Sequence, residues 1–340
     1  PPTCFKVRWL TWEGADIWLA DPISEASQEE ELISIKDVRR IRMALDYRVS
    51  ADYILSGGIL ANKIGFGKTA TTLGLIDTTL KKPRNSACEP DGFIPAKGTL
   101  ILVPSNLHVQ WLSEIGKFLY GDRRLHPMKG SWSPSDCPLR IFAPSTITPL
   151  TKATASEIAD ADIVLCSYNF LFSGIYEHRR LELTKMSFTP YKELIRQTRM
   201  LQKGTGNVPN GYCKTRTAKG LSVACTEKEL VFPVLEMFAW NRIVLDEVHE
   251  LERMNYSQQI FLQHLRAKHR WGLTGTPPIS STAGILFMSS LFQIDLVGIL
   301  RSTSGVADLS ACEASPVITE LANEFCKCFV RQEPEMLEIK

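Results

Sequence analysis

The stretch "GGILANKIGFGKTATTLGLI", residues 57–76, decides the fold of this 340-residue chain. A short apolar run leads into a turn rich in glycine, and Leu73, Ile76 and Leu80 follow at helical spacing. Glycines let a backbone approach an anion closely, and the free N–H groups of a helix start point toward it. Strand, glycine turn and helix therefore predict a phosphate-binding loop, although such a turn can also form without a ligand.

Two side chains of this loop have predicted roles. Lys68 would neutralise the β and γ phosphates of ATP, and the Thr69 hydroxyl would bind Mg²⁺. Asn62 stands where the full Walker pattern has glycine, a departure that helicase-type loops share. The other candidates for contact with the nucleotide are Gly65, Phe66, Gly67 and Ala70.

A second motif, "RIVLDEVHEL" at residues 242–251, supplies carboxylates at the end of an apolar run. Asp246 can hold Mg²⁺ partly through water, and Glu247 can orient the attacking water. Buried carboxylates are costly unless a metal or a base compensates them, so a plain turn is the weaker interpretation. With His249 two residues further on, the predicted catalytic residues are Lys68, Asp246, Glu247 and His249.

A third motif, "RWGLTGTP" at residues 270–277, ends another apolar run with small polar residues. Taken alone, Thr-Gly-Thr-Pro reads as a tight turn. Beside the other two motifs, Thr274, Gly275 and Thr276 become candidates for contact with the nucleotide.

The chain alternates between short apolar runs and segments of helical spacing, which predicts an α/β fold with a mainly parallel sheet and ligands at the carboxyl ends of its strands. Residues 82–97 are expected to form a surface loop, and residues 174–237 an insertion with short helices of its own. The five predicted strands are residues 55–61, 99–103, 162–166, 242–245 and 271–274.

Composition excludes several classes of protein. Hydrophobic residues make up 44% and charged residues 22%, which argues against extensive disorder. The nine cysteines are scattered without a Cys-x-x-Cys pair, so reduced thiols of an intracellular protein are expected, and Cys326 and Cys328 lack further metal ligands. The chain opens with Pro-Pro and without a signal peptide, so we expect a piece of a longer protein. No membrane partner is expected, since Gln293 and Asp295 interrupt the most apolar tract.

Together these motifs resemble the Swi/Snf helicase-like ATPases of helicase superfamily two. The matching segments follow in the family's order and cover nearly everything from residue 56 onward. They are residues 57–69, 99–118, 162–171, 246–249 (the DEAH-type box), 271–281, 286–298 and 324–332.

The resemblance implies a RecA-like three-layer α/β/α sandwich of the P-loop NTPase class, which is the first lobe of a DNA-dependent motor. It implies ATP and Mg²⁺ as cofactors, double-stranded DNA or nucleosomes as partners, and a nuclear role in chromatin remodelling or DNA repair. The long insertion looks most like the RING-bearing repair branch, with repair or ubiquitin-pathway partners. Residues 1–55 would extend residues 56–340, the ATP-binding lobe, and residues 299–340 would link it to an absent second lobe.

Some residues depart from the family pattern. Asn62, Lys63 and Ile64 stand where the family has Asp-Glu-Met, no glutamine motif for adenine is evident before residue 56, and Arg331-Gln332 replaces a pair of arginines. A degenerate scaffold that binds DNA or chromatin partners without ATP turnover is therefore the competing hypothesis. An arginine from a second lobe contributes about 10³ to 10⁵ in rate, so this lobe alone should hydrolyse ATP poorly.

Residues 179–219 hold ten lysines and arginines, with Tyr191 and Tyr212 among them. This interval is a candidate for contact with DNA phosphates, and a merely solvated face is the equal alternative. Trp111, Trp240 and Trp271 are expected to pack in the core.

Overall fold

The computed structural model describes residues 3–7, 10–12, 45–47, 51–55, 57–63, 65–80, 92–121, 131–185, 190–214, 221–277, 282–292, 326–327 and 330–331. Most of the expected N-terminal extension (residues 1–55) and of the expected linker (residues 299–340) lies outside the described residues. Ile64, Cys328 and Gln332 also lie outside them. No helix in the described ranges has the length and apolar character that crossing a membrane requires.

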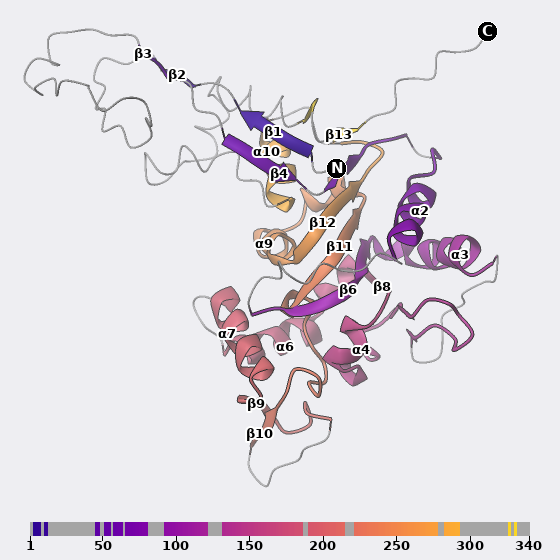
Figure 1. Ribbon diagram of the computed structural model, residues 1–340, viewed down its shortest axis with the longest axis vertical. Helices are drawn as coiled ribbons and strands as arrows, with labels where there is room; N and C mark the ends of the chain where they lie inside the picture. Colours follow the sequence, from indigo (N-terminus) through magenta and orange to yellow (C-terminus); the bar gives the residue numbers. More distant parts are fainter. Residues whose placement is uncertain are drawn as a thin grey trace, which may run out of the picture.

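A seven-stranded sheet forms the centre of the molecule (Figure 1), with the order β13-β5-β12-β11-β6-β8-β7. All neighbouring strands in it are parallel. Its strands are β5 (Gly57–Leu60), β6 (Ile94–Val103), β7 (Ile141–Phe142), β8 (Ile163–Ser167), β11 (Phe238–Asp246), β12 (Arg266–Leu273) and β13 (Val330–Arg331).

Helices cover both faces of the sheet, because successive residues of its strands point to opposite sides. On β6, Ile101 and Val103 belong to one apolar cluster and Leu100 and Leu102 to the other. The first cluster includes residues of α2 (Lys68–Leu80) and α3 (His108–Leu119). The second includes residues of α4 (Ala155–Ala159), α5 (Tyr168–Leu171), α6 (Gly174–Thr184), α7 (Pro190–Gln202), α8 (Val248–Leu251), α9 (Tyr256–His264) and α10 (Thr282–Leu291).

The predicted RecA-like three-layer α/β/α sandwich is thus confirmed, and each of the five predicted strands is present. Several boundaries were wrong; β11, for example, begins at Phe238 rather than at residue 242. β6 begins at Ile94, inside the expected loop, because Ile94 and Ala96 are buried while Pro95 and Lys97 point outward. β12 begins at Arg266, before any apolar run, because its polar first half pairs with β11.

The insertion forms α6 and α7, as predicted, followed by the antiparallel pair β9 (Gly206–Pro209) and β10 (Ser222–Cys225). It is more than a solvated appendage. Tyr176, Leu194 and Leu201 are buried in the apolar cluster that includes the sheet. Arg179 is also buried, and its Nε donates to the Phe232 carbonyl at 3.0 Å.

Before the sheet, two antiparallel strand pairs form. β1 (Thr3–Val7) pairs with β4 (Ala51–Leu55), and β2 (Leu10–Trp12) pairs with β3 (Leu45–Tyr47). They lie outside the seven-stranded sheet, so the functional motifs depend on the later strands alone.

Candidate nucleotide-binding site

Three strand ends bring the predicted motifs together. β12 lies between β5 and β11, and Leu273 pairs with Leu60 on one side and with Asp246 on the other. The glycine turn, the Thr-Gly-Thr segment and the acidic pair therefore leave the sheet at the same level. Since strands lie about 4.8 Å apart, β5 and β11 are separated by about 10 Å.

The glycine turn has the backbone that the sequence predicts. Gly65 and Gly67 have positive φ values of 89° and 69°, which a side chain would disfavour. Gly65, Phe66 and Gly67 are exposed, and α2 begins directly afterwards at Lys68. The Lys68 amine donates to the carbonyls of Asn62 at 2.8 Å and Lys63 at 3.3 Å, so it points into the turn.

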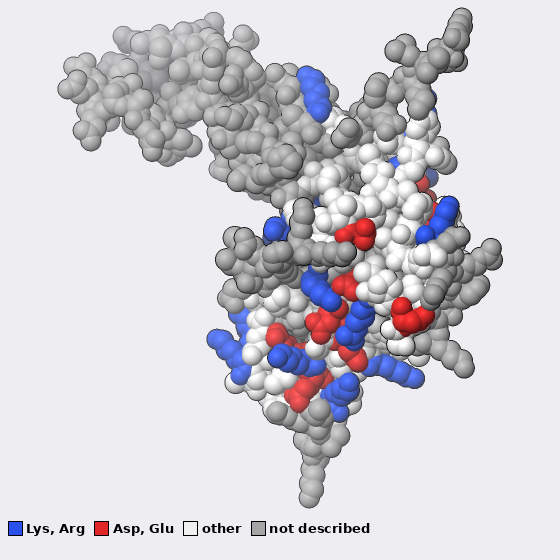
Figure 2. Space-filling model, turned by 45° about the vertical axis from the view of Figure 1, so that its right-hand side comes forward, with Lys and Arg blue, Asp and Glu red and all other residues white. Residues whose placement is uncertain are grey.

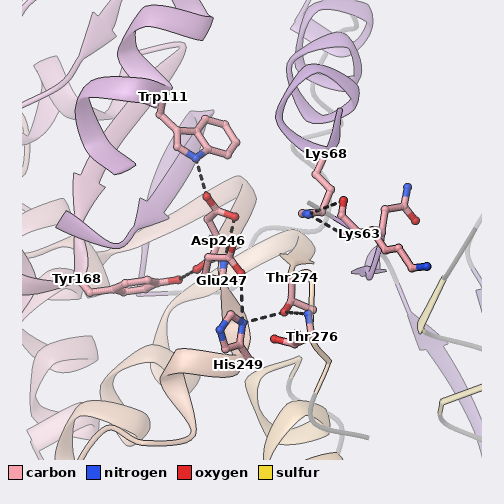
Figure 3. A network of polar contacts seen from close by, with 10 residues as sticks. Lys63, Lys68, Trp111, Tyr168, Asp246, Glu247, His249, Thr274 and Thr276 are labelled. Atoms are coloured by element: carbon pink, nitrogen blue, oxygen red, sulfur yellow. Dashed lines mark hydrogen bonds and ion pairs between the residues drawn. The ribbon is translucent and has the colours of Figure 1, made fainter. Parts of the chain in front are cut away.

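Asp246 is buried, and both of its carboxylate oxygens accept hydrogen bonds (Figure 3). Trp111 Nε1 donates to Oδ2 at 2.7 Å, and the Glu247 N–H donates to Oδ1 at 3.0 Å. The Tyr168 hydroxyl donates to the main-chain carbonyl of Asp246 at 2.8 Å. Burial raises the pKa of Asp246 to about 6, although the Trp111 bond and the charge of Lys68 act in the opposite direction.

Trp111 has a role that the sequence did not reveal. It was expected to pack in the core, and it is indeed 2% exposed. The sequence indicated only that a buried indole N–H needs a hydrogen-bond acceptor. The acceptor, Asp246, is 135 residues further along the chain and is identified only by the packing of α3 against β11.

The residue after Asp246 has an unusual backbone. Glu247 adopts φ 49° and ψ 51°, a left-handed conformation that costs a non-glycine residue free energy. Such strain clusters at functional sites. Here it places the Glu247 carboxylate 3.2 Å from His249 Nδ1.

His249 links the acidic motif to the third motif. Its Nδ1 also lies 2.9 Å from Thr274 Oγ1, which in turn accepts a hydrogen bond from the Thr276 N–H at 3.1 Å. Figure 3 shows this chain of contacts from β11 to the segment after β12, with Lys68 on the same side of the sheet. Thr274 is fully buried, Gly275 half-buried and Thr276 exposed.

The side chains present fit a magnesium-bound triphosphate. Mg²⁺ prefers hard oxygen ligands, and Thr69 and Asp246 offer a hydroxyl and a carboxylate. The Lys68 amine is held by neutral carbonyls, for which phosphate oxygens are stronger substitutes. Thr69 and Ala70 lie half-buried in the first turn of α2, where the N–H groups are unpaired within a helix.

The relatives of this chain that have curated descriptions are distant and much longer. A DNA (cytosine-5-)-methyltransferase DMT5 of Cryptococcus neoformans is 22% identical, over 89% of this chain and 17% of its own length. A DNA repair protein RAD5 of Candida albicans is 25% identical, over 71% of this chain and 17% of its own. The chain therefore spans less than a fifth of these proteins.

Among solved structures, the SWI2/SNF2 ATPase core of Sulfolobus solfataricus in complex with double-stranded DNA is similar at a TM-score of 0.42 and 16% identity. The match covers 82% of this chain and 40% of that one. The family model of the SNF2-related domain matches residues 6–305, which is well over half of the sequence. The chain thus belongs to the SNF2-related domain family.

Proposed function

We propose that this chain is the ATP-binding lobe of a DNA-dependent ATPase that couples ATP hydrolysis to movement on double-stranded DNA. The main support for the proposal is that Leu60, Leu273 and Asp246 are paired across neighbouring strands. This pairing brings the glycine turn with Lys68 and the acidic pair to the same edge of the sheet. Similarity to a protein named for DNA repair favours a nuclear role in repair over one in chromatin remodelling.

Each candidate residue has a part in this proposal. Lys68 neutralises the β and γ phosphates, and the backbone of Gly65, Phe66, Gly67 and Ala70 surrounds them. Thr69 and Asp246 hold Mg²⁺, partly through water. The ion, when bound, offsets negative charge on the phosphate oxygens.

Glu247 orients the attacking water, and its strained backbone fixes the direction of the carboxylate. His249 and Thr274 connect that carboxylate to the segment after β12, where Gly275 and Thr276 lie near the nucleotide. A change in the bound nucleotide at the end of β11 can therefore be transmitted through these contacts to the end of β12.

For DNA we propose a cavity of about 320 Å³ at the carboxyl ends of β6 and β8. Hydroxyl and amide side chains contact phosphates while leaving the base sequence unread. The cavity offers such groups from Ser105, Ser145, Thr146 and Asn169, whereas the hydroxyls of Ser167 and Ser173 cap α5 and α6.

The basic interval is the weaker DNA surface. Lys192, Arg196, Arg199 and Lys203 are exposed, as a solvated face would also be. Arg196 Nη2 lies 2.6 Å from Glu193, while Arg179 is buried. Figure 2 shows lysine and arginine atoms mixed with acidic ones over the lower part of the molecule, where Figure 1 places α6 and α7. A mixed surface attracts phosphate less than a uniform one.

The second candidate is a scaffold that binds DNA or chromatin partners, including repair or ubiquitin-pathway proteins, without ATP turnover. Asn62 and Lys63 favour it, because an amide and a base stand there in place of the family's two acids. In the structure the Lys68 amine donates to the main-chain carbonyls of these two residues. Under this hypothesis the amine stays there in the presence of ATP.

Calorimetric titration of the chain with ATP, with and without Mg²⁺, distinguishes the ATPase hypothesis from the scaffold hypothesis. We expect Mg²⁺-dependent binding that Lys68→Ala weakens about 10- to 100-fold, because a charged hydrogen bond contributes about 1.5–3 kcal/mol. Lys63→Ala is the matched control, an exposed lysine of the same turn. Unchanged affinity in Lys68→Ala would remove the phosphate-loop assignment, and absence of binding near millimolar ATP would favour the scaffold.

The motor part of the proposal needs the longer protein. When the chain is joined to a second lobe, we expect hydrolysis that duplex DNA stimulates. Paired replacement of Ser145 and Asn169 by alanine should weaken that stimulation. A complete protein that binds ATP but hydrolyses none with DNA present would defeat the motor assignment.

A further inference from the structure

A second row of polar residues crosses the sheet four residues before the carboxyl ends of β6, β11 and β12. Arg242 of β11 is in register with Thr99 of β6 on one side and with His269 of β12 on the other. These positions share the face that α2 and α3 cover, because Ile101, Val244 and Leu273 continue the same alternation in one apolar cluster. The last turn of α2, with Thr79, contacts this row.

Arg242 is a buried cation whose hydrogen-bond partners are neutral. Its side chain is 4% exposed, Nη1 donates to Thr99 Oγ1 at 3.2 Å, and Nη2 donates to Thr79 Oγ1 at 3.0 Å. Nε is buried without a partner. No carboxylate within the described ranges forms an ion pair with it. Burial lowers the pKa of Arg242 to about 10, the direction expected of a cation without a counter-charge.

Arg270 is a second buried guanidinium; its Nε also lacks a partner and burial lowers its pKa to about 9, but its terminal nitrogens have stronger acceptors. Its Nη1 and Nη2 donate to the Leu265 carbonyl, and Nη2 also donates to the Leu262 carbonyl. These carbonyls lie at the C-terminal end of α9, where the helix dipole is negative. Arg242 has two threonine hydroxyls instead, and hydroxyls are weaker partners for a cation.

A cavity of about 410 Å³ lies against Arg242. Its charged lining comprises Lys97, Asp162, Arg242 and Lys268. Lys97 Nζ lies 3.1 Å from Asp162, the one acid among the lining residues, so this pair cancels. Arg242 and Lys268 remain, against roughly half a negative charge from the end of α2. The cavity is therefore positively charged.

A bulge in β6 shapes one wall. Between the pairs Trp240–Ala96 and Arg242–Thr99, one residue of β11 faces the two residues Lys97 and Gly98 of β6. A Cβ atom on Gly98 would lie 2.1 Å from the Ala161 carbonyl, so only glycine fits there. Bulges redirect side chains beside binding sites, and this one lies beside Asn241, which is one of the lining residues.

We propose that this cavity binds a small anion bearing phosphate groups, with Arg242 and Lys268 as its charged contacts and Asn241 as a neutral one. A buried charge is stable when it is paired, and an entering anion would supply the missing counter-charge. The guanidinium is too deeply buried for the backbone of a nucleic acid, whereas a compact anion fits the volume.

The cavity is separate from the ATP site. Lys68 and Thr79 lie at opposite ends of α2, and eleven residues of helix span about 16 Å. Binding at either site can therefore be removed by mutation without changing the other site. The proposal of an anion site does not depend on whether the chain hydrolyses ATP.

Calorimetric titration of the whole chain with pyrophosphate, without Mg²⁺, tests the site in a Lys68→Ala background that weakens phosphate binding at the glycine turn. We expect binding that Arg242→Gln weakens at least about tenfold and Lys268→Gln a few-fold. Arg242→Lys should retain part of the affinity. Lys117→Gln, an exposed lysine on α3, is the matched control and should change nothing.

His269 gives a second readout by NMR titration. Burial, then Arg242 and Lys268, lower the pKa of its imidazole, so a bound anion should raise it. Because Lys268 is exposed, its variant tests the site even if Arg242→Gln does not fold. Absence of pyrophosphate binding, or equal affinity in the Lys268→Gln variant with an unmoved His269 signal, would overturn the proposal. Displacement of pyrophosphate by duplex DNA would overturn the small-ligand assignment.

Discussion

The end and the middle of β11 carry buried charges of opposite sign on the same face of the sheet. Asp246 closes the strand, and Arg242 lies four residues earlier, about 13 Å away. Asp246 receives hydrogen bonds from Trp111 and Glu247, and its pKa is still raised to about 6 by burial. Arg242 has only threonine hydroxyls, and burial lowers its pKa to about 10. Each charge is therefore incompletely compensated by the protein itself.

The difference lies in the counter-charge that each residue lacks. Asp246 at the carboxyl end requires a cation, which Mg²⁺ would supply, and Arg242 in the middle of the strand requires an anion. Helix α2 spans both, with Lys68 at its start and Thr79 near its end. One strand and one helix thus prepare two sites of opposite charge preference.

The largest effect is expected from Asp246→Asn. Mg²⁺-dependent ATP binding should fall by more than about a hundredfold, since losing a residue that merely supports a metal ligand already costs about 10- to 100-fold. Titration with ATP at several Mg²⁺ concentrations measures this. Equal Mg²⁺ dependence in the variant would show that Asp246 does not serve the ion.

The same substitution should stabilise the fold at pH 7. The pKa of Asp246 is raised in the folded state from 3.8 to about 6, so the folded chain binds the proton more tightly. Its contribution to stability is full at acid pH and is lost as pH rises from about 4 to about 6. The loss is about 3 kcal/mol. Asp246→Asn should recover part of it in urea unfolding at pH 7, because the amide has no charge but its nitrogen cannot accept one of the two hydrogen bonds. A less stable variant would contradict this account.

Trp111→Phe should act on the ATP site indirectly. Removing the hydrogen bond that lowers the pKa of Asp246 should raise that pKa further and weaken Mg²⁺–ATP binding by about tenfold. The measurement is ATP affinity as a function of pH, whose acid limb should move upward.

Trp240→Phe is the control. Its indole donates to the Leu235 carbonyl at 3.1 Å, far from the acids. Both variants should lose about 1–3 kcal/mol of unfolding free energy. A similar shift of the pH profile in both would show that Trp111 acts on stability alone.

The smallest effect is expected at Arg242, in the middle of β11. Thr79→Val removes a hydrogen-bond acceptor from Arg242 and should destabilise the fold by about 1 kcal/mol. Thr78→Val is the control, because Thr78 is exposed and donates only to its own helix. Pyrophosphate, if the anion site is present, should reduce the difference between the variants in thermal unfolding. Equal stability of both would show that the Thr79 contact contributes nothing.

Much of the fold followed from local patterns. Apolar runs of four to seven residues predicted five strands, because a strand buried on both faces needs no polar alternation. Apolar runs did not predict strand residues where pairing with a neighbouring strand, rather than the local sequence, determines the structure. Arg266 and His269 belong to β12 because β11 offers them hydrogen bonds, and the two-residue strands β7 and β13 are too short to leave a signal.

The sequence by itself determined the glycine turn with Lys68, the acidic pair and the Thr-Gly-Thr turn, because backbone dihedrals and strand ends impose local residue requirements. Tertiary structure alone decided the bond from Trp111 to Asp246 and the cavity beside Arg242. The reason is physical. A buried polar group specifies that it needs a partner, but which distant side chain provides that partner depends on how the helices lie over the sheet.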